Sequence, residues 1–297
     1  MKRIFIGGLG RSGTTIALKI FYHHPDCFAV PIETKFLVEE DGFADLVDAM
    51  TIRFSPPASM TAYTRFTRQM RAEVTGEVPS KYGDLHQYSH HIFPSYNDAL
   101  DRFVGVVLRK RYFPEREPLI SAVRAFVQET FDYTAAISNK KCWVEKTPAN
   151  IWRFDFLREL FPDCYFIHMI RNPLDVYYSL REKGWLSNNL VASLVDFEGR
   201  CAALAKRRRR LLADPRFIEI KLEDLVDNPT QTMQKIFRRC DLPLMDDDGM
   251  EAVINVMNRY YAEKENRISR HLSEQEWDIV VELLQPWAVE FGWQGMR

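Results

Sequence analysis

The segment IFIGGLGRSGTT, residues 4–15, decides the fold of this 297-residue chain. Its first apolar residues predict a short strand, its glycines predict a tight turn, and the apolar spacing from Ile16 onward predicts a helix. Such a turn directs backbone N–H groups and a helix N-terminus at one point, which suits a phosphate-like anion. The segment therefore predicts a phosphate-binding loop at the end of a first strand.

The residue after Gly13 limits which phosphate ligand this loop would take. The spacing from Gly8 to Gly13 is that of a nucleotide P-loop, but Thr14 stands where nucleoside triphosphatases have lysine. That lysine reaches the β- and γ-phosphates of a triphosphate. Its absence favours a ligand with a 5′-phosphate group and no γ-phosphate, although a glycine-rich turn without a ligand stays open.

A second stretch, residues 164–179, repeats the arrangement of strand, turn and helix. A buried strand is predicted over residues 164–170, and Arg171 follows at its carboxyl end, where open α/β sheets bind ligands. Pro173 suits the first turn of the next helix, which places Ser179 about two turns in. Because arginine offers a planar fork and serine a hydroxyl to phosphate oxygens, this stretch predicts a second phosphate site. The alternative is an Arg171–Asp175 ion pair with Ser179 facing solvent.

Two phosphate sites on one sheet, the first without the lysine, describe 3′-phosphoadenosine 5′-phosphosulfate (PAPS). The chain resembles the PAPS-dependent sulfotransferases, most of all the tyrosylprotein type and related bacterial enzymes. Residues 10–15 resemble their 5′-phosphosulfate loop, and residues 171–179 resemble their 3′-phosphate signature. The run His24-Pro25-Asp26 and the following Glu33 resemble the segment that carries their catalytic glutamate.

Glu33 and Lys146 each follow or end a predicted strand, over residues 27–30 and 142–145. At the carboxyl edge of the sheet, a carboxylate accepts a proton from an attacking hydroxyl or amine, and a cation neutralises developing negative charge. The bland alternatives are a helix cap or a Lys35 ion pair for Glu33, and a surface position for Lys146. The resemblance implies that Glu33 is the base, and that Lys146 and Arg11 stabilise the leaving diphosphate.

The resemblance also implies a donor-binding set and the molecules it handles. PAPS would be the donor and 3′-phosphoadenosine 5′-phosphate (PAP) the product, with no metal ion. A loop at residues 266–270 sits where the family covers the 3′-phosphate. The donor-binding residues implied are Gly10, Arg11, Ser12, Gly13, Thr14, Thr15, Arg171, Ser179, Arg267 and Ser269.

Strand and helix patterns alternate along the chain, which predicts an α/β fold of the P-loop type, a mostly parallel sheet flanked by helices. Residues 41–139 interrupt the alternation as a helical insert, with helical stretches at residues 63–74 and 118–137. We expect one domain over residues 1–297, with the insert as an acceptor-side lid. The strands expected are 2–7, 27–30, 142–145, 164–170 and 216–221, and the helices 14–23, 149–160, 173–183 and 190–213.

Composition bounds the partners and the compartment. The net charge of −1 does not suggest a nucleic-acid binder. The basic run at residues 206–210 predicts a solvated helix face, or else a docking patch for an anionic acceptor or membrane surface. Five cysteines without CxxC spacing predict reduced, mostly buried thiols. With neither a signal peptide nor a long apolar run in the sequence, we expect a cytoplasmic protein without a transmembrane segment.

The insert carries aromatic and histidine residues at 82–96, among them His86 and His90 at helical spacing. A metal site there is disfavoured because no HExxH pattern accompanies them.

Taken with the resemblance, the two phosphate sites predict a sulfotransferase that moves the sulfuryl group directly to a hydroxyl or amine of a small-molecule, glycan, lipid or peptide acceptor. The alternatives are a P-loop nucleotide kinase-like phosphotransferase and a non-catalytic nucleotide-binding sensor. The sequence does not indicate the acceptor or the oligomeric state.

Overall fold

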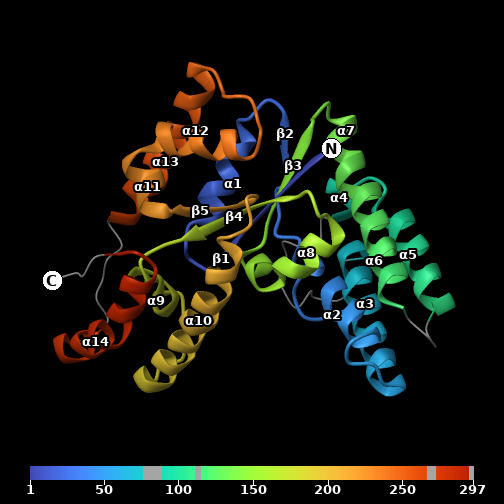
Figure 1. Ribbon diagram of the computed structural model, residues 1–297, viewed down its shortest axis with the longest axis horizontal. Helices are drawn as coiled ribbons and strands as arrows, with labels where there is room; N and C mark the ends of the chain where they lie inside the picture. Colours follow the sequence, from blue (N-terminus) through green and yellow to red (C-terminus); the bar gives the residue numbers. More distant parts are fainter. Residues whose placement is uncertain (76–88, 111–114, 266–271, 294–297) are drawn as a thin grey trace. The chain divides into compact units, whose positions relative to one another are not determined.

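A computed structural model describes residues 1–75, 89–110, 115–265 and 272–293 of the chain. Five strands make one sheet in the order β2-β3-β1-β4-β5, and the pairs β1–β3, β2–β3 and β4–β5 are parallel. Helices flank this sheet, so the predicted α/β class is confirmed (Figure 1). The strands are β1 Lys2–Gly8, β2 Cys27–Ala29, β3 Cys142–Lys146, β4 Tyr165–Ile170 and β5 Phe217–Lys221.

The chain divides into two compact units, which are described separately. Unit 1 comprises Met1–Gly7 and His24–Tyr165, and unit 2 comprises Gly8–His23 and Phe166–Arg297. Strand β3 pairs with β1 on one side, with Ile6 opposite Lys146, and with β2 on the other. All five β3 residues are buried, which is expected for a parallel strand covered on both faces.

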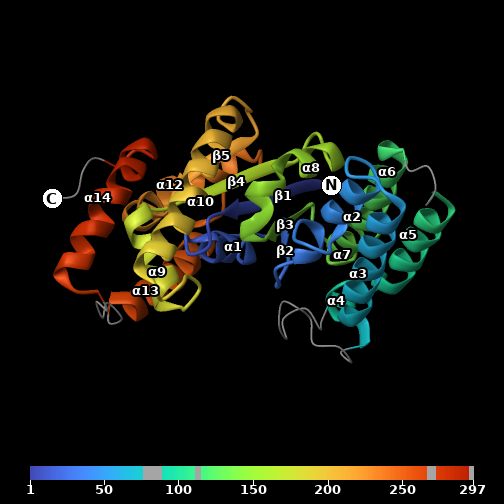
Figure 2. The same ribbon diagram turned by 90° about the horizontal axis from the view of Figure 1, so that it is seen from below.

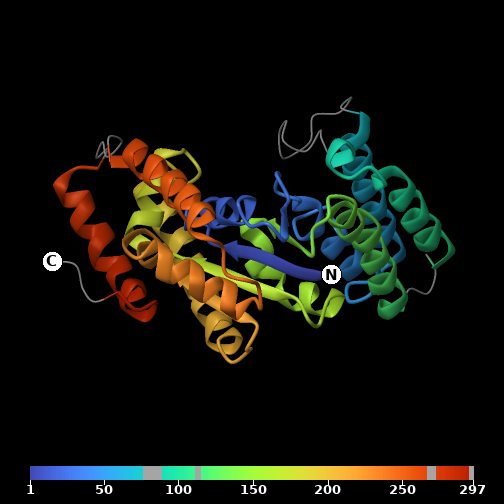
Figure 3. The same cartoon turned by 90° about the horizontal axis from the view of Figure 1, so that it is seen from above.

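The predicted insert is helical, and its helices share an aromatic core. The Phe43 ring lies 4.9 Å from that of Phe66, and 4.8 Å from those of Phe103 and Phe126. Figures 2 and 3 show the ribbons of the helices that carry these rings, α2, α3, α5 and α6, gathered in one part of unit 1. The expected role as a lid stays a prediction. The helices of unit 1 are η1 Lys35–Leu37, α2 Phe43–Met50, α3 Pro56–Thr75, α4 Ser89–Ile92, α5 Tyr96–Lys110, α6 Arg116–Val127, η3 Gln128–Asp132, α7 Tyr133–Ile137, η4 Pro148–Arg153 and α8 Phe154–Leu160.

In unit 2 the paired strands β4 and β5 carry helices whose starts follow from local sequence. The Asn172 side chain accepts the Leu174 N–H at 3.0 Å, and Pro173 opens α9, as the sequence predicted. Helix α14 begins with a capping box between Ser273 and Glu276. The helices are α1 Thr14–Tyr22, α9 Pro173–Glu182, α10 Leu190–Leu211, α11 Leu222–Asp227, α12 Pro229–Arg239, α13 Asp247–Glu265 and α14 Glu274–Glu290.

The expectation of five reduced cysteines is wrong for two of them. Cys27 and Cys142 form a disulfide, with 4.8 Å between their Cα atoms. They are direct neighbours at the start of the parallel strands β2 and β3, which places their side chains together although 115 residues separate them. Within the described residues the free cysteines are Cys164, Cys201 and Cys240, and these are buried as predicted.

The expectation of a solvated basic face at residues 206–210 is wrong for Arg208. Its guanidinium is largely buried and binds Glu219 of β5 through two hydrogen bonds, of 2.6 and 2.7 Å. Arg209 pairs with Glu290 of α14 at 2.8 Å. Lys206, Arg209 and Arg210 are exposed, so the expected solvated face is confirmed for these three residues. Across the described ranges, no helix has both the length and the apolar character needed to cross a membrane.

Candidate functional site

The predicted phosphate loop lies between β1 and α1, and its backbone is set by glycine. Gly13 precedes α1 with φ of 94°, and a Cβ on it would meet Leu222 Cδ1 at 2.6 Å. A Cβ on Gly8 would meet the Met169 carbonyl oxygen at 2.3 Å. Thr14 and Thr15 form the first turn of the helix, where N–H groups have no helical acceptor. The structure therefore has the glycine turn before a helix that the sequence predicted, and anion binding by this loop stays a prediction.

Three predicted donor-binding residues of unit 2 lie together. The Arg11 Nε–H donates to Ser179 Oγ at 3.0 Å, and Arg171 Nη1 donates to the Arg11 carbonyl at 3.4 Å. Ser179 is 7% exposed, so the predicted alternative of a solvent-facing serine is wrong. Arg171 also lies 3.7 Å from Asp175, so the alternative ion pair is present but long. We call Arg11, Arg171 and Ser179 the arginine–serine group.

A carboxylate that sequence reasoning missed fixes the turn beside Arg171. Glu223, in the first turn of α11, accepts the Asn172 N–H at 3.1 Å. Burial raises the pKa of Glu223, and its second oxygen is buried without a hydrogen-bond partner. The sequence could have indicated Glu223, because it lies just after β5, at the same edge of the sheet where Arg171 follows β4.

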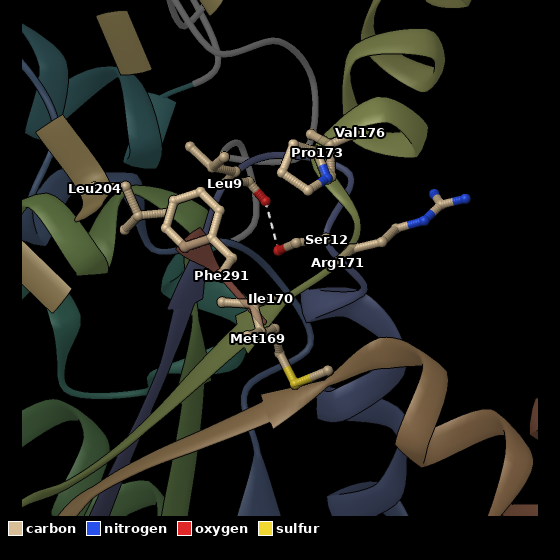
Figure 4. A pocket seen from close by; sticks show the side chains of 9 residues that line it. All are labelled: Leu9, Ser12, Met169, Ile170, Arg171, Pro173, Val176, Leu204 and Phe291. Carbon is tan, nitrogen blue, oxygen red and sulfur yellow. Dashed lines mark hydrogen bonds between the residues drawn. The ribbon is translucent and has the colours of Figure 1, made fainter. Parts of the chain in front are cut away.

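Ser12 serves the loop itself in this structure. Its hydroxyl donates to the Leu9 carbonyl at 2.7 Å, and its backbone N–H donates to the same oxygen at 3.1 Å. Figure 4 shows this bond beside a small pocket, with the Arg171 guanidinium extending away from Leu204 and Phe291. The pocket has about 10 Å³ of space, enough for about one water molecule, so it does not hold a nucleotide.

In unit 1 the two predicted catalytic residues contact each other. Lys146, the last residue of β3, donates from Nζ to Glu33 Oε1. Lys35 lies 3.8 Å from the other Glu33 oxygen, so the predicted Lys35 pair is also present. The Lys146 side chain is 6% exposed and that of Glu33 is 27% exposed. Lys146 is therefore not a surface lysine, and Glu33 retains access to solvent.

Glu145, next to Lys146, is fully buried and was not predicted. It accepts hydrogen bonds from Thr34 N at 3.2 Å, Thr147 Oγ1 at 2.6 Å and Asn150 Nδ2 at 2.7 Å. Burial raises the pKa of Glu145, and these donors counteract the shift. Thr34 is the residue after Glu33, so the Glu145 carboxylate holds the backbone of the loop that carries Glu33.

The His24-Pro25-Asp26 run has a structural role in unit 1. The Asp26 N–H donates to His24 Nδ1 at 3.2 Å, and the Asp26 carbonyl accepts the N–H groups of Lys141 and Cys142 at 2.9 and 3.0 Å. The run therefore joins the start of β2 to the start of β3.

Some predicted residues lie outside the described part of the chain. Arg267 and Ser269 fall in residues 266–271, and His86 falls in residues 76–88, so their roles stay predictions. Among the residues that the structure does describe, no group of three or more His, Cys, Asp or Glu side chains could hold a metal ion.

Comparisons with known proteins agree on one family. The model of the "Sulfotransferase family" matches residues 3–247. Omega-hydroxy-beta-dihydromenaquinone-9 sulfotransferase Stf3 of Mycobacterium bovis is 25% identical over 132 residues, which are 39% of this chain and 32% of that protein. The same-named protein of Mycobacterium tuberculosis matches equally. The chain thus matches about a third of the length of these curated relatives.

One solved structure resembles this fold over nearly the whole chain. The sulfotransferase domain of the Synechococcus PCC 7002 olefin synthase aligns with a TM-score of 0.51 and 12% sequence identity. The alignment covers 99% of this chain and 95% of that domain. At this identity the likeness concerns the fold.

Proposed function

Because the chain belongs to the sulfotransferase family, we propose that it transfers the sulfuryl group of PAPS to a hydroxyl or amine of an acceptor. The observation that carries the proposal is the arginine–serine group beside a phosphate loop that lacks the triphosphatase lysine. Charge-assisted hydrogen bonds from arginine and a hydroxyl suit the second, 3′-phosphate that distinguishes PAPS from adenosine 5′-phosphosulfate. The loop N–H groups suit its 5′-phosphosulfate.

In the proposed reaction the acceptor oxygen or nitrogen attacks sulfur as the bond from sulfur to the 5′-phosphate oxygen breaks. Glu33 receives the proton of the acceptor, and PAP leaves with the bonding electron pair. Lys146 and Arg11 stabilise the negative charge on the leaving phosphate. Once Glu33 is protonated, it no longer attracts Lys146 as a carboxylate does, so the ammonium charge becomes available to the leaving group. Positioning and charge stabilisation are sufficient for such a direct transfer.

The remaining donor contacts complete this proposal. The backbone of residues 10–15 would hold the 5′-phosphosulfate, with Ser12 in contact after its hydroxyl leaves Leu9. Arg267 and Ser269 would cover the 3′-phosphate. The acceptor is a small molecule, glycan, lipid or peptide, and the mycobacterial relatives are named for a lipid that carries a hydroxyl group. A mass-spectrometric screen of pooled metabolites for PAPS-dependent gain of one sulfuryl group identifies it.

The donor assignment is tested by calorimetry in excess EDTA. PAP should bind much more tightly than ATP and without divalent metal, since the loop has Thr14 in place of the lysine that grips a γ-phosphate. Tighter, magnesium-dependent binding of ATP would instead support the kinase-like alternative.

The base assignment is tested by Glu33→Gln, which keeps the size of the side chain and removes its basic site. General base catalysis contributes about 10²- to 10⁴-fold, so kcat for the acceptor found in the screen should fall by about that factor. The affinity for PAP should hardly change. Glu117→Gln, at an exposed position of α6, is the matched control and should keep full turnover. A protein that binds PAP yet sulfates nothing would support the non-catalytic sensor.

A further inference from the structure

The proposed reaction has no role for Glu145, although this carboxylate is 0% exposed in unit 1. A buried carboxylate is costly unless hydrogen bonds satisfy it. Here three donors do so, and none of them is a cation. A buried carboxylate whose hydrogen bonds are satisfied makes the segments that donate to it rigid.

The three donors come from two segments of unit 1, and one of them also binds a third segment. Thr147 Oγ1 and Asn150 Nδ2 come from the turn that follows β3, and Asn150 also donates to the Ile6 carbonyl of β1 at 3.0 Å. The third donor is the backbone N–H of Thr34, from the loop after β2. Glu145 is therefore anchored on the β1–β3 side, and it holds the Thr34 peptide against that anchor.

The Thr34 bond matters because β2 has ended before the loop reaches Glu33. The hydrogen bond of Val30 N to the Val144 carbonyl, at 2.9 Å, continues the pairing with β3 one residue past the strand. The loop then depends on the Thr34–Glu145 bond to fix the peptide that follows Glu33. Two lysines lie at the Glu33 carboxylate, Lys146 in contact with one oxygen and Lys35 at 3.8 Å from the other. The position of the peptide that follows Glu33 therefore bears on how closely the carboxylate meets each lysine.

We propose that Glu145 is a positioning residue, which accepts the Thr34 N–H and thereby keeps the Glu33 carboxylate in contact with Lys146, with Lys35 the more distant of its two lysine neighbours. The role concerns hydrogen-bond acceptance and does not require Glu145 to exchange a proton with the acceptor. The effect of Glu145 on catalysis rests on the proposed function, in which Glu33 is the base. The effect of Glu145 on the position of Glu33 does not, because the pairing of Glu33 with lysine can be measured without turnover.

The geometric test is zero-length cross-linking with a carbodiimide, which joins a carboxylate to the lysine that it contacts. Peptide mapping by mass spectrometry then gives the ratio of Glu33–Lys146 to Glu33–Lys35 amides. Glu145→Met removes the acceptor at similar volume, and the ratio should fall at least about fivefold, as expected for one charge-assisted hydrogen bond. Glu145→Gln retains an oxygen for Thr34 and should restore most of the ratio.

The matched control is Asp132→Leu. Asp132 is another carboxylate of unit 1 that accepts a bond from β3, from Trp143 Nε1 at 2.6 Å, and it also binds Arg3. Its loss should lower the melting temperature and leave the cross-link ratio unchanged. An unchanged ratio in Glu145→Met, or an equal fall in Asp132→Leu, overturns the proposal.

A measurement on the wild-type protein covers the case in which Glu145→Met does not fold. Hydrogen exchange should show the Thr34 amide protected to the same degree as the amides of β3. Free exchange of this amide, as in an exposed loop, would mean that the bond does not hold the peptide, and it would overturn the proposal.

The catalytic test is a double-mutant cycle with PAPS as donor and 1-octanol and 4-nitrophenol as acceptor probes. Glu145→Met should lower kcat by about 10- to 100-fold, as a displaced catalytic group does. In a Glu33→Gln background it should cost almost nothing further, because Glu145 acts through Glu33. Full additivity overturns the positioning role. If the wild-type protein sulfates neither probe, that result counts against the proposed function, and the cross-link ratio still decides the placement of Glu33.

Discussion

The contacts that Arg171 makes within unit 2 are long. Its contacts to the Arg11 carbonyl and to Asp175 measure 3.4 and 3.7 Å, and Asp175 is about half exposed. Exposed pairs of this kind contribute little to stability. A guanidinium has five N–H donors, so these long contacts leave capacity for phosphate oxygens.

Arg171→Ala should therefore weaken binding of the 3′-phosphorylated nucleotide far more than it weakens the fold. A charge-assisted hydrogen bond is worth about 1.5–3 kcal/mol, which corresponds to about 10- to 150-fold in the Kd for PAP. Adenosine 5′-phosphosulfate, which lacks the 3′-phosphate, should lose far less affinity. Calorimetry with both ligands measures the difference.

The matched control for Arg171 is Arg181→Ala, in the helix α9 that follows Arg171. The Arg181 side chain donates to Ser193 Oγ at 3.0 Å, and we assign it no donor contact. Its removal should leave PAP affinity near the wild-type value. Equal losses of PAP and adenosine 5′-phosphosulfate in Arg171→Ala would show that Arg171 binds something other than the 3′-phosphate.

At the residue scale, the sequence predicts charged groups better than it predicts what holds them. Glu33, Lys146 and Arg171 stand out because a strand end is followed or closed by a charge. Glu145 and Glu223 lie near strand ends too, but each accepts a backbone N–H from a remote segment. No residue spacing encodes such a bond, since any residue except proline could supply the donor.

At the element scale, the predicted phosphate loop depends on how closely it packs within unit 2. Gly13 has φ of 94°, and Leu222 of α11 occupies the space where a side chain would begin. Positive φ and a close neighbour penalise a side chain independently of each other. The loop therefore needs glycine at this position for packing as well as for its backbone conformation.

Gly13→Ala should destabilise the protein by about 2–6 kcal/mol and lower PAP affinity, since left-handed backbone and overpacking each cost about 1–3 kcal/mol. The control is Gly105→Ala within α5, where a Cβ would meet no atom within 4 Å. That variant should gain about 0.5–1 kcal/mol from helix propensity. Urea unfolding and calorimetry measure both. A neutral Gly13→Ala variant would mean that the loop can shift away from Leu222.

The bounds of the elements follow from the sequence, whereas their order in the sheet does not. Strand β2 ends at Ala29 and β3 at Lys146, each within one residue of the prediction. Hydrophobic runs and turn residues are local signals, so they are visible in one sequence. The order β2-β3-β1-β4-β5 depends on packing between distant segments, which leaves no local signal.

A buried charge cluster joins β4, β5 and α10 in unit 2. His168 Nδ1 lies 3.1 Å from Glu219, which also binds Arg208. Burial lowers the pKa of His168, so the imidazole is neutral and donates from Nδ1. Burial by itself would raise the pKa of Glu219, but hydrogen bonds from His168 and Arg208 lower it to about 2.

This cluster should make the protein less stable as the pH falls. The unfolded state binds a proton at His168 near its usual pKa of about 6.5, whereas the native state does not, so stability falls below that pH by up to about 1.4 kcal/mol per unit. Glu219 adds a further loss below about pH 4.5, as its unfolded form takes up a proton first. Urea unfolding between pH 7 and pH 5 should show a shallower slope in His168→Gln. An unchanged slope would place the proton uptake elsewhere.

At the scale of the whole molecule, the disulfide links the two ends of the segment that contains the helical insert, for which the sequence predicted no tested function. Cys27 and Cys142 bracket the insert at residues 41–139. The predicted thiols reflected an odd cysteine count, and pairing of strands so far apart in sequence was not visible. A cross-link over 115 residues removes a large loop entropy from the unfolded state, up to about 4–5 kcal/mol in the chain-entropy model.

The purified protein should therefore show three thiols before reduction and five after it, from its five cysteines less the disulfide pair. The count is made with a thiol reagent in denaturant, because burial raises the pKa of Cys201 to about 12 and keeps it unreactive in the fold. Dithiothreitol should lower the free energy of unfolding by about 2–4 kcal/mol. Cys27→Ser should show the same loss without reductant and should no longer respond to it, whereas Cys240→Ala, which removes a free thiol, should keep the response. Five thiols in protein purified without reductant would show that β2 and β3 pair without a covalent link.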